Sequence, residues 1–249
     1  QISTRPLKLA DGKPNLQGYW VSASGPGGRG PGPDGKGKGG PKGDFKGPDF
    51  KGKDFKGKDF KGKDKDKGPP PNAPEMTAAG SAAAAKYDQR FDDPAVKCSP
   101  ANIFFGWNHD QHVNEIVQTA DSITLRYGYM DLVRKIDLKA TSHPTNLKPS
   151  LGGHSIGHWE GDILVVDTVG FEPGVLIPLG GILHSAQMHA TERFSLDAAT
   201  GALIRAYRAE DPTFWKGPYI GQDRMVLSAQ PYSPYHCVEL SGKNNLRPQ

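Results

Sequence analysis

The chain has 249 residues, with 35% hydrophobic, 9% aromatic and 23% charged side chains and a formal net charge of +4. This length fits one large all-β domain or two small domains. Residues 31–70 hold twelve Lys and seven Asp, a net +5, so the rest of the chain carries 4 minus 5, or −1. The Asp carboxylates in this Lys-rich tract partly neutralise its positive charge, so the tract is poorly suited to bind the phosphates of a nucleic acid. No apolar run approaches the ~20 residues of a transmembrane helix. The composition therefore argues against a nucleic-acid partner and predicts no transmembrane segment.

The first predicted strand follows a short polar arm. Residues 17–22 read Gln-Gly-Tyr-Trp-Val-Ser, and we expect Trp20 to lie in the core. Shifts in composition then divide the chain into four expected parts: an N-terminal arm with the first strand (1–24), a low-complexity insertion (25–71), a connector (72–97) and a β-barrel domain (98–249).

The insertion contains a five-residue repeat. Its units run from Asp44 to Lys63 and read Asp-Phe-Lys-Gly-Pro once and Asp-Phe-Lys-Gly-Lys three times. A pentapeptide β-helix is excluded because its inward-facing small position would fall on lysines, and burying unpaired ammonium groups is costly. Two interpretations remain. The insertion is either flexible and solvated, or it pairs between copies of the chain through alternating Lys and Asp and through the rings of Phe45, Phe50, Phe55 and Phe60.

The rest of the chain predicts strands with almost no helix. A short Ala-rich helix is expected within residues 77–86, and the clearest hairpin lies within 154–171, with its turn at Glu160-Gly161-Asp162. Further strands are expected at 103–107, 113–119, 122–129, 132–138, 188–196, 202–209, 224–229 and 236–240. Because closure removes sheet edges, this pattern predicts an all-β fold, an antiparallel up-and-down barrel similar to the lipocalins.

The two cysteines, Cys98 and Cys237, bracket the predicted barrel domain. We expect them to form a disulfide; the alternative is two buried free thiols. The chain begins at Gln1 without Met, as a mature chain would after removal of a signal peptide. Together these features predict an oxidising compartment, so that the protein is secreted, extracellular or periplasmic.

Eight histidines raise the question of a metal site. None has the compact spacing of a zinc motif such as His-Glu-x-x-His. A barrel can nevertheless gather His143, His154 and His189 from separate strands and loops. We therefore take these three as a candidate ligand or divalent-metal site, inside the barrel or at its mouth, and expect no other cofactor. The alternative is a purely structural role for hydrogen-bonded or surface histidines.

Glu192 is a fourth candidate for ligand contact. Alternation along the strand 188–196 places it on the apolar side, opposite His189. A carboxylate there needs a partner, for which Arg126 and Arg205 are candidates. The alternative is a structural ion pair.

Residues 157–171 read Gly-His-Trp-Glu-Gly-Asp-Ile-Leu-Val-Val-Asp-Thr-Val-Gly-Phe. This run resembles a largely uncharacterised family of secreted bacterial proteins that carry Gly-Arg-Trp-Glu-Gly-Asp-Thr-Leu-Val-Val-Asp-Thr. The resemblance covers most of residues 95–240, including His143-Pro144, His154-Ser155 and the run 185–194. It implies export and a lipocalin-like barrel, but no catalytic residues. His158 stands where Arg is usual, and the insertion has no counterpart.

Two functions follow from these features. The repeat favours a structural, self-assembling extracellular subunit of a fibre, filament or matrix, in which the chain is a homo-oligomer or polymer. The histidines favour a small-molecule- or metal-binding barrel, with or without enzymatic activity, that uses His143, His154, His189 and Glu192.

Overall fold

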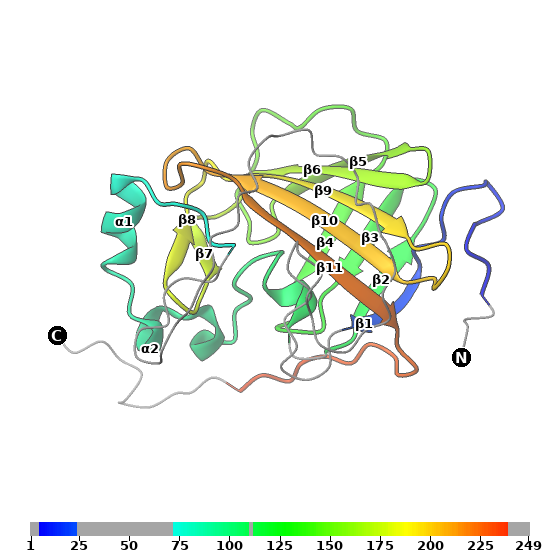
Figure 1. Cartoon of the computed structure of the whole chain (residues 1–249), viewed down its shortest axis with the longest axis horizontal. Coiled ribbons are helices and arrows are strands. Elements are labelled where there is room, and N and C mark those ends of the chain that lie inside the picture. Colours follow the sequence, from blue (N-terminus) through cyan, green and yellow to red (C-terminus); the bar gives the residue numbers. More distant parts are fainter. Residues whose placement is uncertain (1–4, 24–71, 110–111, 239–249) are drawn as a thin grey trace.

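The computed structural model describes residues 5–23, 72–109 and 112–238. Strands in these ranges close into a barrel in the order β1-β11-β10-β9-β6-β5-β4-β3-β2, which confirms the expected all-β barrel (Figure 1). The barrel strands are β1 (Gly18–Ser22), β2 (Asn114–Gln118), β3 (Ser122–Arg126), β4 (Val133–Asp137), β5 (His154–Glu160), β6 (Ile163–Val169), β9 (His189–Leu196), β10 (Leu203–Glu210) and β11 (Tyr219–Leu227).

The strands follow one another around the barrel as an up-and-down meander with one exception. Neighbouring strands are antiparallel, but β4 and β5 run parallel and are joined over only two residue pairs, Ile136 with Ser155 and Asp137 with Ile156. The cause is the long connection 138–153, which carries the chain back across the barrel before β5 begins. The junction of β4 and β5 is therefore the least paired seam in the described barrel.

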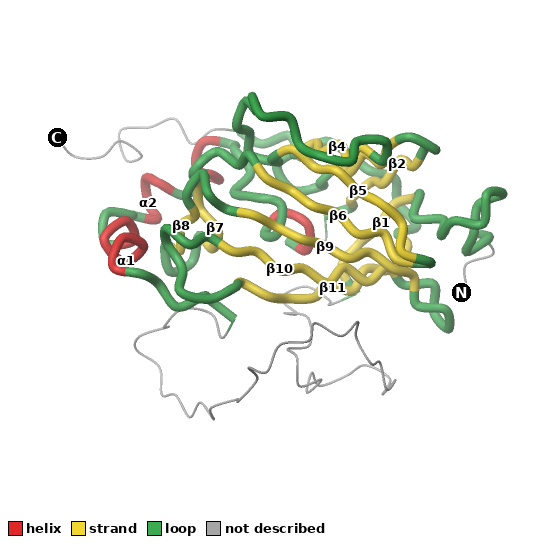
Figure 2. The backbone as a smooth tube through the Cα atoms, turned by 90° about the horizontal axis from the view of Figure 1, so that it is seen from above, coloured by secondary structure: helices red, strands yellow, loops and turns green. Residues whose placement is uncertain are grey.

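Smaller elements cover one end of the barrel, and the N-terminal arm lies at the other end (Figures 1 and 2). The covered end carries helices α1 and α2 and a two-stranded sheet, and two 3-10 helices lie in the segment that leads into β2. These elements are α1 (Ala78–Ala84), α2 (Gln89–Asp92), η1 (Pro94–Lys97), η2 (Gly106–Asn108), β7 (Gly174–Ile177) and β8 (Ile182–His184). Thr77 caps α1, because its hydroxyl accepts the backbone N–H of Gly80 at 3.0 Å.

Three sequence-based expectations about the strands are corrected. Residues 103–107 form a turn that leads into η2, because the side-chain oxygen of Asn102 accepts the backbone N–H groups of both Phe104 and Phe105. The last barrel strand begins at Tyr219, earlier than expected. The strand expected at 236–240 does not form over the described residues 236–238. β7 and β8 were not expected.

Large side chains pack the interior of the barrel. Trp20, Trp107, Tyr127 and Phe194 are all at most 1% exposed. Trp20 comes from β1, so the strand on the far side of the insertion supplies one of the largest groups in the core.

The expected disulfide joins Cys98 to Cys237, with their Cα atoms 5.6 Å apart. Cys237 lies beyond β11, in a C-terminal segment that runs back along the barrel (Figure 1). The hydroxyl of Tyr232 donates a hydrogen bond to Asp131 at 2.6 Å, and the backbone N–H of Tyr235 donates to the same carboxylate. The bridge and these hydrogen bonds hold the segment against the barrel.

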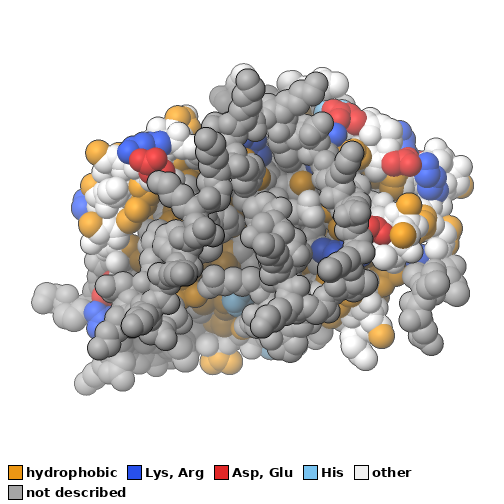
Figure 3. Space-filling view, in the orientation of Figure 1, with side chains coloured by type: hydrophobic (Ala, Val, Ile, Leu, Met, Phe, Trp, Pro, Cys, Tyr) orange, Lys and Arg blue, Asp and Glu red, His pale blue; other side chains and the backbone are white. Residues whose placement is uncertain are grey.

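The described surface carries charges of both signs. Ion pairs join Lys8 with Asp162 and Lys216 with Glu75, and Figure 3 shows side chains of opposite charge next to one another at both ends of the face in view. No helix within the described residues is long and apolar enough to cross a membrane.

Candidate functional site

Three adjacent strands and one loop bring His143, His154, His189 and Asp167 together. His154 begins β5, Asp167 lies near the end of β6, and His189 begins β9. His143 comes from the connection 138–153. The residues that follow in the strands point into the barrel and are buried, namely Ser155, Thr168 and Ala190. By alternation the cluster lies on the outer face of the barrel, which corrects the expected position in the interior.

The four side chains form a linear chain of hydrogen bonds. Nε2 of His189 lies 2.5 Å from Oδ1 of Asp167, and Nε2 of His143 lies 2.8 Å from Oδ2 of the same carboxylate. Nδ1 of His143 lies 2.8 Å from Nδ1 of His154. Asp167 thus connects two imidazoles, and His143 connects Asp167 to His154.

The positions of the protons follow from these partners. Partial burial raises the pKa of Asp167, but hydrogen bonds from His189 and His143 outweigh burial and lower the pKa overall. The ionised carboxylate therefore accepts an Nε2–H from each histidine. With its Nε2–H assigned to Asp167, His143 has a lone pair on Nδ1, which accepts the Nδ1–H of His154. This leaves Nε2 of His154 unprotonated.

His154 is suited to act as a base at neutral pH. Burial lowers its pKa, His143 lowers it further, and the charge of Asp137 opposes both effects. The ring is therefore neutral at pH 7. Its Nε2 has no hydrogen-bond partner among the described residues, so the basic lone pair is available to a bound molecule.

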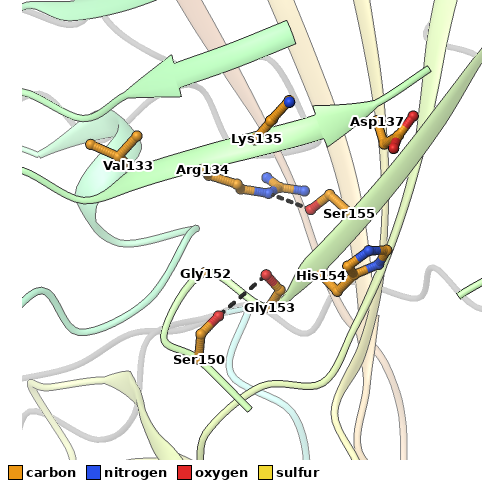
Figure 4. A pocket seen from close by; sticks show the side chains of 9 residues that line it. All are labelled: Val133, Arg134, Lys135, Asp137, Ser150, Gly152, Gly153, His154 and Ser155. Atoms are coloured by element: carbon orange, nitrogen blue, oxygen red, sulfur yellow. Dashed lines mark hydrogen bonds between the residues drawn. The ribbon is translucent and has the colours of Figure 1, made fainter. Parts of the chain in front are cut away.

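A pocket of about 300 Å³ opens beside His154, over the sparsely paired seam between β4 and β5 (Figure 4). Outward-facing Val133, which is 58% exposed, and Lys135 contribute to its wall from β4, and Ser150 contributes from the opposite side. Asp137 also lines the pocket, but the backbone N–H groups of residues 139 and 140 bind its carboxylate and lower its pKa. Lys135 has no ion-pair partner among the described residues. The pocket thus combines a base, an ammonium group, a hydroxyl and a small apolar surface.

The geometry does not converge on a metal ion. Each oxygen of Asp167 is bonded to a different imidazole, and both nitrogens of His143 are used within the cluster. In the described part of the chain, no group of three or more His, Cys, Asp or Glu is placed to hold a metal ion. Divalent-metal binding at His143, His154 and His189 remains a prediction.

Glu192 is separated from the histidines. It lies on the inner face of β9 and forms ion pairs with Arg134 and, at 3.4 Å, with Arg205. Of the two partners suggested by the sequence, Arg205 is therefore present, whereas Arg126 forms a surface pair with Glu115 at 3.1 Å. Alternation along β9 explains the separation, because His189 and Glu192 are an odd number of positions apart and must face opposite ways.

Sequence reasoning missed Asp167, Arg134 and the pocket. Asp167 was visible as an acidic residue within a β-branched strand, where a polar side chain on the outer face needs a polar neighbour. Its partners come from β9 and from the connection 138–153, and no local pattern identifies them.

Comparisons with known proteins add little to this picture. No family model matches the chain, and no curated protein matches it significantly. A crystal structure of a mutant of the fluorescent protein UnaG is similar over 57% of this chain and 88% of its own, with 14% sequence identity and a TM-score of 0.29. At these values the similarity carries no argument about function, and the barrel assignment rests on the strand pairing described above.

Proposed function

We propose that the protein is an exported barrel that binds a small polar molecule in the pocket beside His154 and transfers a proton to or from it. The observation that carries this proposal is the hydrogen-bonded chain from Asp167 through His143 to His154, which ends at the pocket. Perturbed histidines next to a cleft are typical of acid–base sites. Export is supported by the disulfide, which fits an oxidising environment.

The proton transfer can be followed atom by atom. Nε2 of His154 takes a proton from the bound molecule or from a water next to it. The Nδ1 proton of His154 then passes to Nδ1 of His143, whose Nε2–H remains bonded to Asp167. The positive charge therefore comes to lie beside the carboxylate, which stabilises it. Reversal of these steps returns the proton, so His154 acts as base and acid in turn.

The other side chains of the site bind the ligand or orient the histidines. Lys135 offers an ammonium group, so the pocket favours a ligand with acceptor or negatively charged groups, and Val133 favours a short apolar part. The hydroxyl of Ser150 donates to the carbonyl of Gly153 at 3.3 Å and offers a ligand its lone pairs. His189 binds the second oxygen of Asp167 and so fixes the carboxylate that orients His143.

The test is hydrolysis of 4-nitrophenyl acetate, an activated ester that reports on a general base. We expect His154→Asn to lower the rate per molecule by about 10²- to 10⁴-fold. His158→Asn is the matched control, because His158 lies on the same strand, is 67% exposed and takes no part in the cluster. Equal rates for the wild-type protein and both variants would contradict the proposed acid–base role.

The repeat from Asp44 to Lys63 favours a second proposal, self-assembly of the secreted protein into a homo-oligomer or polymer. The repeat and the rings of Phe45, Phe50, Phe55 and Phe60 lie outside the described residues, so the support is the sequence alone. Assembly and proton transfer are compatible, since the cluster lies on the barrel itself.

A further inference from the structure

A second pocket, of about 230 Å³, lies at the other end of β5 from His154. His158 and Trp159 form one side of it, Asp11 and Lys13 of the N-terminal arm form another, and Leu138 completes its apolar part. Trp159 lies five positions after His154 along the extended strand, which corresponds to about 16 Å. The two pockets are therefore distinct.

Trp159 differs from the other tryptophans of the chain. Trp20, Trp107 and Trp215 are at most 3% exposed, whereas Trp159 is half-buried. One part of its indole packs against the core, and another part lines the pocket. The indole N–H has no hydrogen-bond partner among the described residues. An accessible indole with a free donor in a pocket is typical of binding surfaces rather than of cores.

The charges around this indole balance each other. Asp11 and Lys13 carry opposite charges, and Nζ of Lys13 lies 5.9 Å from the centroid of the Trp159 ring. A ligand of either sign would therefore meet one attractive and one repulsive group. A neutral ligand with many hydroxyl groups can use both, because the carboxylate accepts hydrogen bonds and the ammonium group donates them.

The wall of the pocket is also held in place before any ligand binds. The side-chain oxygen of Gln118 accepts the backbone N–H of Leu16 at 2.8 Å, and its amide nitrogen donates to the carbonyl of Pro14 at 3.1 Å. These bonds attach the N-terminal arm to the end of β2. A site that is formed in advance loses less entropy when it binds.

We propose that this pocket binds a neutral carbohydrate, with one pyranose ring on the indole of Trp159. A pyranose has a face of C–H groups and a rim of hydroxyls, so the face packs on the aromatic ring while Asp11 and Lys13 bind the rim. The ring takes the position over the indole now occupied by Nζ of Lys13, and this ammonium group turns to the hydroxyls. An amine bound between Trp159 and Asp11 is disfavoured, since Lys13 already places a positive charge there.

Tryptophan fluorescence gives a direct test, because acrylamide in water reaches Trp159 far more readily than the three buried tryptophans. Glucose, galactose, mannose and N-acetylglucosamine serve as probes, with choline as the amine. We expect at least one sugar to protect the protein from acrylamide quenching, with a half-effect near a Kd of about 1 mM. Asp11→Asn should weaken this protection at least about fivefold, since it removes a charged acceptor.

Glu172→Gln is the matched control, since it also removes one carboxylate but lies on the exposed surface away from the pocket, and it should leave the protection unchanged. Trp159→Phe should remove most of the quenchable signal. Trp159 also packs on the core, so Trp159→Phe can affect the fold as well as the pocket. Calorimetric titration of the wild-type protein and of Asp11→Asn measures sugar binding without the Trp159→Phe variant. The proposal is overturned if no sugar changes quenching or heat at up to about 100 mM, or if choline protects Trp159 and the sugars do not.

Discussion

The residues under the strongest constraint are the charges sealed inside the barrel. The side chains of Glu192, Arg134 and Arg205 are at most 1% exposed, and Glu192 lies between the two guanidinium groups. Arg205 also pairs with Asp223, whose pKa is raised by burial despite the opposing effect of Arg205. Buried charges are tolerated only when they are paired, so each member of this group depends on the others.

Replacing Glu192 with Gln should therefore destabilise the fold strongly. The change keeps the shape of the side chain but leaves two buried guanidinium groups without their shared counter-charge. We expect the free energy of unfolding in urea to fall by about 3 to 5 kcal/mol. Glu210→Gln removes the partner of Arg208 on the surface and should cost at most about 1 kcal/mol. Similar losses for both variants would show that the interior group does not depend on its charge balance.

His184 should make stability depend on pH. Burial lowers its pKa, and the carbonyl of Ser185 and the charge of Asp211 oppose this effect without reversing it. The unfolded chain, with an ordinary pKa of 6.5, then binds the proton more readily than the folded protein, so stability falls as the pH drops below 6.5. Melting temperatures measured from about pH 7 to about pH 5, the range in which histidine titrates, should fall less in His184→Gln than in the wild-type protein. His158→Gln, at an exposed position, should leave the pH dependence unchanged.

Some residues of the site could be predicted from the sequence, and others could not. His143, His154 and His189 could be grouped because each lies at a turn or strand start near the central hairpin, and the structure places them in one cluster. Asp167 and Arg134 could not be found in this way. Both take their roles from partners on strands that are distant in sequence, and only the pairing of β6 with β9 and the closure of the barrel bring those partners near.

At the scale of elements, α1 packs closely because of one glycine. A Cβ at Gly80 would lie 2.2 Å from the carbonyl oxygen of Phe214. The hydroxyl of Thr77 also donates a hydrogen bond to the carbonyl of Thr213. The helix therefore lies directly on the backbone of the segment after β10.

This contact makes the effect of Gly80→Ala opposite to what helix propensity predicts. Alanine in a helix interior is favoured over glycine by about 1 kcal/mol, yet here the new methyl group must displace a backbone carbonyl. We expect a lower melting temperature for Gly80→Ala and a slightly higher one for Ser81→Ala, which is exposed on the same helix. A stabilised Gly80→Ala variant would show that α1 can move away from Phe214 at little cost.

Strands with a regular alternation of apolar and polar residues were predicted correctly. Segments whose conformation depends on the hydrogen bonds of one side chain were not. The turn at Gly161 and the strands β5 and β6 follow from local sequence. Residues 103–107 have strand-like composition but turn because the amide of Asn102 binds the backbone ahead of it. The parallel pairing of β4 with β5 depends on the path of the connection 138–153, which has no regular hydrophobic pattern to predict it.

For the whole molecule, the insertion can be tested by deletion. Its four Phe would supply about 1.5 to 3 kcal/mol each if fully buried, whereas ordering 40 residues costs about 1 to 2 kcal/mol per residue. Burial of these rings would therefore gain less free energy than ordering the insertion costs, and we expect the stability of the barrel not to depend on it. We expect a variant lacking residues 31–70 to keep its melting temperature within a few degrees and to lose any higher-order assembly in sedimentation. A large drop in melting temperature would place the repeat in the core, and unchanged sedimentation of an already monomeric parent would rule out assembly.

The position of the disulfide has a consequence for how the barrel is connected. The bridge from Cys98 to Cys237 closes β2 to β11 into one covalent ring, and β1 lies outside it, on the far side of residues 24–71. β1 nevertheless completes the barrel by pairing with both β2 and β11. Strand pairing with β2 and β11 therefore joins β1 to the rest of the barrel, and the disulfide does not secure it there. A single proteolytic cut within residues 24–71 would leave β1 as a separate peptide bound to the barrel by strand pairing alone. If β1 of a neighbouring copy took the same place, the chains would be joined by strand exchange.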